Sequence, residues 1–268
     1  MRLLRALCLA LLALAAPFPA AAGDFGDVAE VTVLPGWRTP QGTHMAALRI
    51  RLAPGWKTYW RAPGDAGIPP RFSWEGSRNL AAVRFHWPRP EVHEINGMRS
   101  IGYHGELVLP MEFTPASPGE PIRLRAEVEI GVCQEICVPL QAEIAAELVP
   151  GGGPDPAITA ALAARPATAR EAGVAAVSCD IEPIRDGLRL TARIDMPPLG
   201  PEEVAVFELS DQSIWISEAT GRREGRRLTA ASDMVPPSGA PFLLDRSEVR
   251  ITVLGRGRAV ELSGCPSG

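Results

Sequence analysis

Proline and glycine recur along the whole chain and divide it into short segments. The 268 residues include 27 Pro and 26 Gly, and both favour turns because proline fixes φ and glycine tolerates positive φ. Between these turns several segments alternate apolar and polar residues, as in 122–130, and this two-residue period is typical of β-strands. The sequence therefore predicts an all-β fold of short strands and leaves little room for long helices.

Seven segments before residue 150 have the length and pattern of strands. They are 28–33, 45–52, 71–74, 83–87, 107–113, 122–130 and 141–148. We interpret Pro35-Gly36 as a turn that ends the first of them, and 92–105 as a polar, irregular stretch. Seven short strands with turns at this spacing predict an immunoglobulin-like β-sandwich.

The composition changes after residue 150. Pro150 to Pro154 is a Gly/Pro break, and the Ala-rich segment after it has the pattern of a short helix over 158–164, ended by Pro166. The alternating pattern resumes near residue 174, and Asp186-Gly187 marks a hairpin turn. We therefore expect a first β-domain at 23–150, a Gly/Pro/Ala-rich linker at 151–173, and a second, smaller β-domain at 174–268.

The first 22 residues have the organisation of a signal peptide. Arg2 and Arg5 precede an apolar run, and small residues lead to a cleavage site near Ala22. Cys8 lies inside the apolar run, so we interpret it as part of the signal and not as a lipid attachment site. The run is too short to span a bilayer comfortably, and no later segment is long and apolar enough. These features predict an exported protein whose mature chain is not inserted in a membrane.

The charge balance argues against nucleic acid as a partner. The chain has 27 Lys and Arg against 31 Asp and Glu, which gives a net charge of -4 at pH 7. Nucleic-acid binding requires clustered basic residues. The sequence also contains neither a nucleophile elbow nor a His-Glu-x-x-His motif. We therefore expect no nucleic-acid partner and no hydrolytic chemistry.

Four cysteines remain once the signal peptide is removed, namely Cys133, Cys137, Cys179 and Cys265. In an oxidising compartment an even number favours disulfide pairing, and sequence order suggests Cys133–Cys137 and Cys179–Cys265. The second bridge would close a loop of about 86 residues, and the loop-entropy model gives it about 4 kcal/mol of stabilisation. We therefore predict a structural disulfide between Cys179 and Cys265 that closes the second β-domain.

The pair Cys133 and Cys137 constrains the chain locally. A disulfide needs Cα atoms roughly 4.4–6.8 Å apart, whereas four residues of extended strand span about 13 Å. The chain must therefore fold back across 134–136, as a tight hairpin or as one helical turn. So small a loop gains little stability from cross-linking, and strained or exposed disulfides are the reactive ones. Redox exchange is the favoured role, with a soft-metal site and an inert structural clip as alternatives.

Three ordered pieces of the segment 23–150 carry a resemblance to a known family. The first is a strand that ends in Pro54 to Trp60 and leads to Ile68-Pro69-Pro70. The second is Val92-His93-Glu94 followed by Leu107 to Pro110, and the third is the cysteine pair with the following Pro139. In this order they resemble the N-terminal periplasmic domain of DsbD-type thiol:disulfide reductants, including the ScsB-like group. The cysteine piece is the most specific of the three.

The resemblance implies an immunoglobulin-like domain that shuttles between dithiol and disulfide. Such domains take electrons from a membrane partner through a thioredoxin-like domain and pass them to periplasmic disulfide-bond proteins. It implies that Cys133 and Cys137 are the redox pair, that Cys137 attacks the partner, and that the protein is periplasmic and needs no cofactor or metal. Tyr59 corresponds to an aromatic residue beside the site. The cap loop that shields the cysteines, with its surroundings, corresponds to His93, Glu94, Ile95, Asn96, Gly97 and Met98.

Some features depart from the family pattern. Only three residues separate the two cysteines, and Ile95 and Met98 stand where the family cap presents an aromatic ring. No Lys or Arg lies within the cysteine motif to lower the pKa of a thiol, and Glu135 would raise it if close. No membrane domain and no thioredoxin-like domain follow in the sequence, so separate proteins are expected to supply the electrons.

Two other functions stay open on the sequence. Soft thiolates suit Cu(I), so the pair could belong to a periplasmic copper-handling protein. The side chains available to complete a copper site are His44, Met45, His93, Met98, His104 and Met111. The other function is a non-catalytic β-sandwich interaction module, whose contacts would be Trp56, Tyr59, Trp60, Trp74 and Trp87. Aromatic residues at this density are more often core residues.

Overall fold

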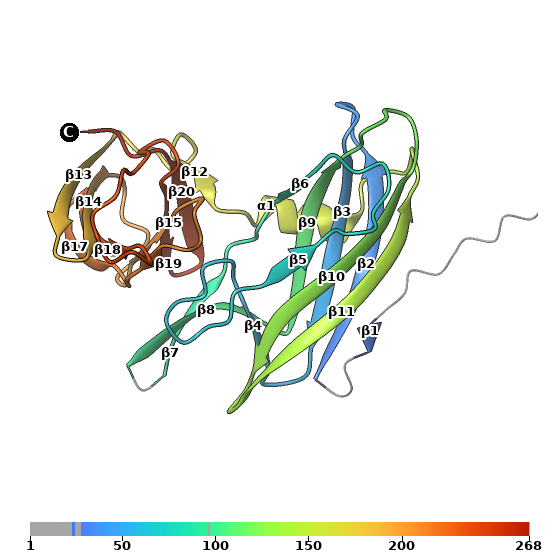
Figure 1. The fold of residues 1–268 in the computed structure, drawn as a ribbon, viewed down its shortest axis with the longest axis horizontal. Coiled ribbons are helices and arrows are strands. Elements are labelled where there is room, and N and C mark those ends of the chain that lie inside the picture. Colours follow the sequence, from blue (N-terminus) through green and yellow to red (C-terminus); the bar gives the residue numbers. More distant parts are fainter. Residues whose placement is uncertain (1–22, 25–27, 96, 268) are drawn as a thin grey trace, which may run out of the picture.

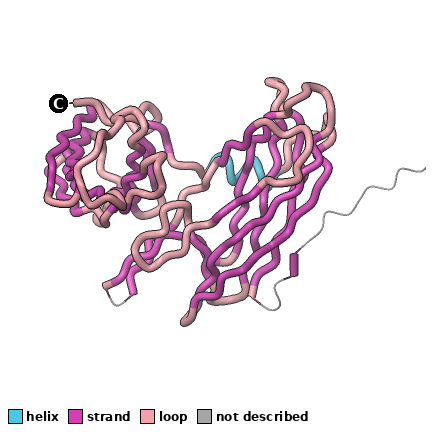
Figure 2. The backbone as a smooth tube through the Cα atoms, viewed as in Figure 1, coloured by secondary structure: helices cyan, strands magenta, loops and turns pink. Residues whose placement is uncertain are grey.

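The computed structural model describes residues 23–24, 28–95 and 97–267. Within these ranges the chain forms two bodies of mostly antiparallel strands and one short helix (Figures 1 and 2). The prediction of an all-β fold is therefore confirmed. The expected signal peptide, with Arg2, Arg5, Cys8 and the cleavage site near Ala22, lies outside the described residues.

Two sheets form the first body. One has the order β1-β2-β3-β9-β6, and the other has the order β11-β10-β4-β8-β7 with β5 paired to β10. The first contains β1 (Gly23–Asp24), β2 (Ala29–Arg38), β3 (His44–Leu52), β6 (Ala82–Phe85) and β9 (Glu106–Thr114). The second contains β4 (Lys57–Tyr59), β5 (Arg71–Ser73), β7 (Glu91–Ile95), β8 (Met98–His104), β10 (Ile122–Cys133) and β11 (Cys137–Leu148).

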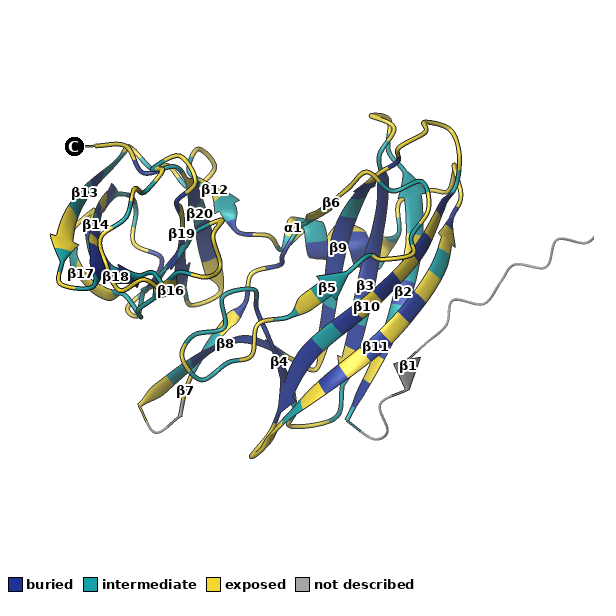
Figure 3. Ribbon diagram, in the orientation of Figure 1, coloured by how far each residue is buried: buried dark blue, intermediate teal, exposed yellow. Residues whose placement is uncertain are grey.

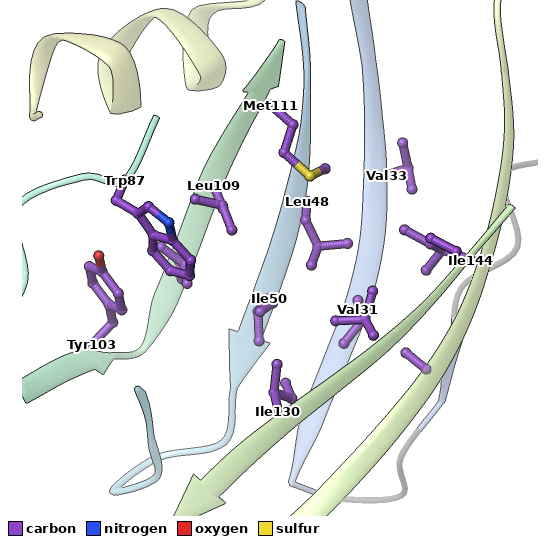
Figure 4. Close-up of a cluster of buried hydrophobic side chains, with 14 of the residues drawn as sticks. Val31, Val33, Leu48, Ile50, Trp87, Tyr103, Leu109, Met111, Ile130 and Ile144 are labelled. Carbon is purple, nitrogen blue, oxygen red and sulfur yellow. The ribbon is translucent and has the colours of Figure 1, made fainter. Parts of the chain in front are cut away.

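Apolar side chains from both sheets fill the space between them. In Figure 4, Val31 and Ile50 of one sheet lie close to Ile130 and Ile144 of the other. Buried and exposed residues alternate along β10 and β11, which gives these strands their striped colouring in Figure 3. Because a strand turns every second side chain inward, this core fixes the register of β10 and β11.

The expected turn at Pro35-Gly36 is wrong. The strand β2 continues through these residues to Arg38, with a register shift between Leu34 and Trp37. Gly36 adopts a φ of +63°, a conformation that glycine takes without steric cost and that bulges use. The glycine therefore marks a β-bulge inside a strand and not the end of the strand.

The stretch 92–105 is also not irregular, because β7 and β8 pair as a hairpin across it. Ile101 and Tyr103 are buried in the core, while Ser100 and His104 lie on the opposite face of the strand. The polar side of this hairpin carries His93 and His104. Glu94 and Arg99 stand on the same face as Val92 and Ile101, so apolar and polar residues do not alternate regularly along the two strands.

A short helix, α1 (Pro156–Ala163), follows the first body. Asp155 caps it by accepting hydrogen bonds from two backbone N–H groups of the first turn, at 2.8 and 3.1 Å, and proline suits the first helical position. Ile158 is buried against Met45 and Ala47, on the face of β3 that points away from the main core. The helix expected at 158–164 thus forms slightly earlier and is packed on the first body.

Nine strands form the second body, in the orders β12-β20-β19-β15 and β13-β14-β18-β16, with β17 paired to β18. They are β12 (Ala167–Thr168), β13 (Ala176–Ile184), β14 (Gly187–Asp195), β15 (Val204–Glu208), β16 (Trp215–Ile216), β17 (Thr220–Glu224), β18 (Arg227–Val235), β19 (Arg250–Gly255) and β20 (Arg258–Ser263). Cys179 and Cys265 form a disulfide in this core, with Cα atoms 5.6 Å apart. In the described part of the chain, no helix is long and apolar enough to cross a membrane.

The segment 151–173, which we expected to be a linker, is divided between the two bodies. The helix α1 packs on the first body, whereas β12 pairs in parallel with β20 of the second. The domain limits at 150 and 174 remain predictions.

Ion pairs and apolar contacts join the two bodies. The Arg61 guanidinium donates to both carboxylate oxygens of Glu208, at 2.7 and 2.9 Å, and to Glu261 at 2.6 Å. Leu254 and Ala259 of the second body belong to the same buried apolar cluster as the core of the first. Because Arg61 lies two residues after β4, these contacts tie the chain next to the cysteine hairpin to the second body.

Candidate functional site

The β10–β11 hairpin brings the two neighbouring cysteines together. The strands pair continuously from Ile122 opposite Leu148 to Cys133 opposite Cys137. The Cα atoms of the two cysteines are 4.1 Å apart and their sulfurs form a disulfide. Residues 134–136 make the turn, closed by a 3.1 Å hydrogen bond from Gln134 N to Ile136 O. Of the two geometries that the spacing allowed, the chain adopts the tight hairpin.

The two sulfur-bearing residues differ in their exposure to solvent. Cys133 is 2% exposed, whereas Cys137 is classed with the exposed residues of the turn. The neighbouring Ile136 is 70% exposed. An incoming molecule therefore meets the Cys137 side of the disulfide first.

Tyr59 lies against the buried side of the disulfide. Its hydroxyl is 2.8 Å from Sγ of Cys133 and 3.3 Å from Sγ of Cys137, and 3.3 Å from the carbonyl oxygen of Ala66. Burial raises the pKa of the Tyr59 phenol, so it stays protonated at neutral pH. Tyr59 thus lies beside the cysteines, and it can donate its one proton to one of these acceptors at a time.

Lys57 is a basic neighbour that the sequence motif did not reveal. It lies opposite Cys133 in the pairing of β4 with β10, and residues that pair across strands project to the same face. Its ammonium donates a 2.8 Å hydrogen bond to Oγ of Ser100, and burial lowers its pKa. The one sequence signal for Lys57 was its place two residues before Tyr59, on the same face of one strand.

A loop at 63–70 covers the other edge of Tyr59. A Cβ atom on Gly131 would lie 2.7 Å from Cβ of Ile68 and 3.1 Å from Cδ2 of Tyr59, so only glycine leaves room for both. The loop is held to β8 by hydrogen bonds from Ile101 N to Pro63 O, at 2.8 Å, and from Ala66 N to β8. Sequence reasoning did not assign this covering role to Ile68.

The 63–70 loop also borders two hollows. One of about 230 Å³ runs from the loop to the strand that follows Cys137, and it is lined by Ile68, Pro69, Arg71, Glu129, Ile130, Pro139, Leu140 and Gln141. A larger one of about 580 Å³ lies between the loop and the second body, where Trp215 is among the lining residues. The loop therefore lies between the disulfide and the second body.

The predicted cap-loop residues belong to the β7–β8 hairpin, and their shielding of the disulfide stays a prediction. In Figure 1 the strands β7 and β8 extend away from the end of the β10–β11 hairpin. Glu94 pairs with Arg99 at 3.0 Å, and Arg99 also pairs with Glu218 of the second body at 3.2 Å. Met98 is 57% exposed. Asn96 and the side chain of Ile95 lie outside the described residues, while Gly97 takes the left-handed conformation of the turn.

The side chains considered as copper ligands do not gather around the cysteines. His44, Met45 and Met111 lie in β3 and β9, in the opposite sheet. His44 is buried, with Nε2 donating to the Pro35 carbonyl oxygen at 2.6 Å. His93 and His104 instead form a group with Glu91 on the β7–β8 hairpin.

The aromatic residues considered as partner contacts are mainly core residues. Tyr59, Trp60 and Trp87 are buried, and Trp56 and Trp74 pack against the main cluster. The sequence-based expectation that they belong to the core agrees with this placement.

The fold and this site together define a mostly-β protein with a cysteine pair at one end of a β-sandwich, in which Cys137 is exposed and Cys133 is buried. Residues 30–148 match the family model described as "Thiol:disulfide interchange protein DsbD, N-terminal", and this segment, which contains Cys133 and Cys137, belongs to the DsbD N-terminal domain family. None of the curated proteins compared with the chain matches it.

The structure is similar to the crystal structure of the N-terminal periplasmic domain of ScsB from Proteus mirabilis. The TM-score is 0.69 at 22% sequence identity, and the match covers 93% of this chain and 98% of that one. Because the match covers 93% of this chain, the likeness concerns the fold of both bodies.

Proposed function

We propose that this protein is a periplasmic thiol:disulfide exchange protein that passes reducing equivalents through Cys133 and Cys137. A membrane or thioredoxin-like protein would supply the electrons, and periplasmic disulfide-bond or thioredoxin-fold proteins would receive them. Membership of residues 30–148 in the DsbD N-terminal family supports this role. The similar ScsB domain is described as periplasmic, which supports the same compartment.

The observation that carries the proposal is the unequal environment of the two sulfurs. Cys133 is buried against the Tyr59 hydroxyl, and Cys137 is exposed at the end of the hairpin. Exchange requires access to one sulfur and a stable place for the other as a leaving group. An inert structural clip has no need of either property.

Reduction of a partner takes two steps. The thiolate of Cys137 attacks one sulfur of the partner's disulfide, which forms a mixed disulfide and releases the partner's other sulfur as a thiolate. The thiolate of Cys133 then attacks Sγ of Cys137, which closes the hairpin disulfide and releases the partner's second thiolate. The pair loses two electrons, the partner gains them, and both partner thiolates take protons from water.

Tyr59 and Lys57 assist the buried sulfur in this scheme. When Cys133 is a thiolate, the Tyr59 hydroxyl at 2.8 Å can donate to it, and Lys57 on the adjacent strand adds a positive charge. Both favour the charged form and so lower the pKa of the thiol. A larger thiolate fraction speeds the second step.

Trapping of mixed disulfides in the periplasm tests the proposal. Cys133→Ser leaves Cys137 able to attack a partner but removes the sulfur that resolves the complex, so covalent complexes should accumulate. Cys137→Ser should trap far fewer, because the remaining sulfur is buried. The double variant Cys179→Ser/Cys265→Ser is the control, since it removes the disulfide of the second body and should leave exchange intact.

Mass spectrometry of the trapped complexes identifies the class of partner. Thioredoxin-fold proteins in the Cys133→Ser complexes support the proposal. The proposal is wrong if neither variant traps a partner and the oxidised hairpin resists reduction by thioredoxin-like proteins, and an interaction module then becomes the better reading.

A further inference from the structure

Glu91, His93 and His104 bring three metal-binding side chains together at a place distinct from the cysteines. Their ligand atoms all lie within 4.8 Å of one another, and in the part of the chain that the structure describes they are the one such group. Oε2 of Glu91 is 3.4 Å from Nδ1 of His104 and 3.7 Å from Nε2 of His93. One carboxylate oxygen thus lies close to both imidazole rings.

The β7–β8 hairpin positions these side chains. Glu91 lies opposite Gly102, and His93 lies opposite Ser100. Residues two apart on one strand, and residues opposite them on the next, share a face of the sheet, so all three ligands project to one side. The rings of His93 and His104 stand edge to face, with centroids 4.4 Å apart and planes at 86°. The group is therefore arranged by paired backbone before any ion binds.

His93 has a ring nitrogen with no protein partner. Nε2 of His93 is shielded from solvent and makes no hydrogen bond with any described residue. An unpaired buried polar atom destabilises the fold, because it has given up its hydrogen bonds to water. The nearest acidic oxygen, on Glu91, is 3.7 Å away, which is beyond hydrogen-bonding range but suits two atoms that share an ion.

The two separations that involve Glu91 fit a tetrahedral ion, and the ligand atoms of the two imidazoles lie within 4.8 Å of each other. Zn–N and Zn–O bonds of about 2.0–2.2 Å at tetrahedral angles place ligand atoms about 3.4 Å apart, close to the observed 3.4 and 3.7 Å. Two imidazoles and one carboxylate suit Zn²⁺, whereas Ca²⁺ and Mg²⁺ prefer oxygen ligands. We propose that Glu91, His93 and His104 bind a divalent transition-metal ion of the Zn²⁺ type, with a fourth position open to water.

This metal site lies on the same face of the sheet as the disulfide and does not involve it. His104 lies opposite Lys57, and Lys57 lies opposite Cys133. The backbones of His104 and Cys133 are separated by two strand spacings of about 4.8 Å each, so they lie about 10 Å apart. The backbone of Lys57 lies between them, and its ammonium donates a 2.8 Å hydrogen bond to Ser100 Oγ. The proposal therefore stands whether or not the cysteine pair exchanges disulfides.

Titration of the oxidised full-length mature protein with ZnCl₂, followed by calorimetry, tests the site. With both disulfides closed the cysteines offer no thiolate ligand, so heat of binding reports on other groups. We expect one equivalent of Zn²⁺, and each of Glu91→Gln, His93→Gln and His104→Gln should weaken binding at least about tenfold. His86→Gln is the matched control, because His86 lies 3.2 Å from Glu112 in a pair that lacks a second histidine.

Ring resonances in the NMR spectrum give a second readout. Zn²⁺ should shift the ring signals of His93 and His104 and leave those of His86 unchanged, and circular dichroism checks that each variant folds. Loss of binding in the three variants, with His86→Gln unaffected, supports the site. Failure of the native protein to bind Zn²⁺, or equal binding by the three variants, overturns the proposal and leaves the group as a cross-strand polar cluster.

Discussion

The hydroxyl of Tyr59 donates a hydrogen bond to Sγ of Cys133 over 2.8 Å, although the two residues are 74 positions apart in the chain. Both residues are 2% exposed. Burial raises the pKa of Tyr59, so the phenol keeps its proton at neutral pH. A neutral donor at a buried sulfur can stabilise the negative charge that appears there when the disulfide opens.

Tyr59→Phe should slow exchange and raise the pKa of the reduced Cys133 thiol. A hydrogen bond to a charged group contributes about 1.5–3 kcal/mol, which corresponds to a rise of at least about one pKa unit. Below that pKa the thiolate fraction, and with it the resolving rate, should fall about tenfold. Stopped-flow kinetics of exchange with a thioredoxin-like protein, repeated over pH, measures both effects.

The control for this variant is Tyr103→Phe, which changes the chain's other tyrosine. Tyr103 donates to Pro88 O at 2.8 Å inside the core, so its loss affects stability without touching a sulfur. Equal slowing in the two variants would contradict a role for the Tyr59 hydroxyl.

Gly131→Ala should displace the 63–70 loop. The added methyl would lie 2.7 Å from Cβ of Ile68, and overpacking of this kind costs about 1–3 kcal/mol. We expect a lower midpoint of urea unfolding and faster alkylation of the reduced Cys133 thiol. The double variant Gly131→Ala/Ile68→Gly should recover part of the loss, because a glycine at position 68 has no Cβ to clash with the added methyl. Additive effects of the two changes would rule out a direct clash.

Arg61→Met should loosen the junction between the two bodies. The guanidinium bonds Glu208 and Glu261 at 2.6–2.9 Å with only 16% of its side chain exposed. Removing the guanidinium leaves two carboxylates without their partner. In other proteins, removal of one partner of a buried ion pair lowers the free energy of unfolding by about 3–5 kcal/mol. Small-angle scattering should show a wider spread of shapes, and calorimetry a separation of the unfolding transitions. Arg189→Met, which breaks the exposed pair with Asp233 inside the second body, should leave the shape unchanged.

His44 should make stability fall as the pH drops below about 6.5. Burial lowers its pKa, outweighing the hydrogen bond to Pro35, and the nearby Arg38 charge lowers it further. Between the lowered folded pKa and the unfolded value, the unfolded chain binds a proton that the folded chain does not. Stability therefore decreases in that window by up to about 1.4 kcal/mol per pH unit.

Urea unfolding of the native protein and of His44→Gln between pH 8 and pH 5 isolates this contribution. A glutamine can still donate to the Pro35 carbonyl oxygen but does not titrate. The difference between the two stability curves should shrink as the pH falls, and parallel curves would exclude His44 as the cause.

The reversal of the chain at the cysteines could be predicted from sequence because its constraint is local, although the spacing allowed a helical turn as well as the hairpin that forms. Two cysteines four positions apart in an extended strand are too far from each other to form a disulfide. The alternating residues on either side of the pair also indicated two strands. The all-β fold was predictable for the same reason, since the two-residue period and the Pro/Gly turns are local signals. The hairpin at 92–105 was missed because Glu94 and Arg99 interrupt the apolar side of its two strands.

The neighbours of the disulfide could not be predicted in this way. Lys57 and Ile68 reach Cys133 and Gly131 only through the pairing of β4 with β10 and the course of the 63–70 loop. Arg61 meets Glu208 across 147 residues. No local pattern encodes such contacts, because they depend on how separate sheets pack.

The pairing of β10 with β11 holds Cys133 opposite Cys137 whether or not their sulfurs are joined. Eleven further residue pairs precede this one along the two strands, so the backbone hydrogen bonds keep the Cα atoms near 4.1 Å. In a mixed disulfide the second thiol therefore acts at a very high effective concentration, as in well-oriented intramolecular reactions. The lifetime of the mixed disulfide with a partner then depends on how firmly the last residue pairs of the β10–β11 hairpin stay paired. A substitution that frays this end should prolong that lifetime without altering either sulfur.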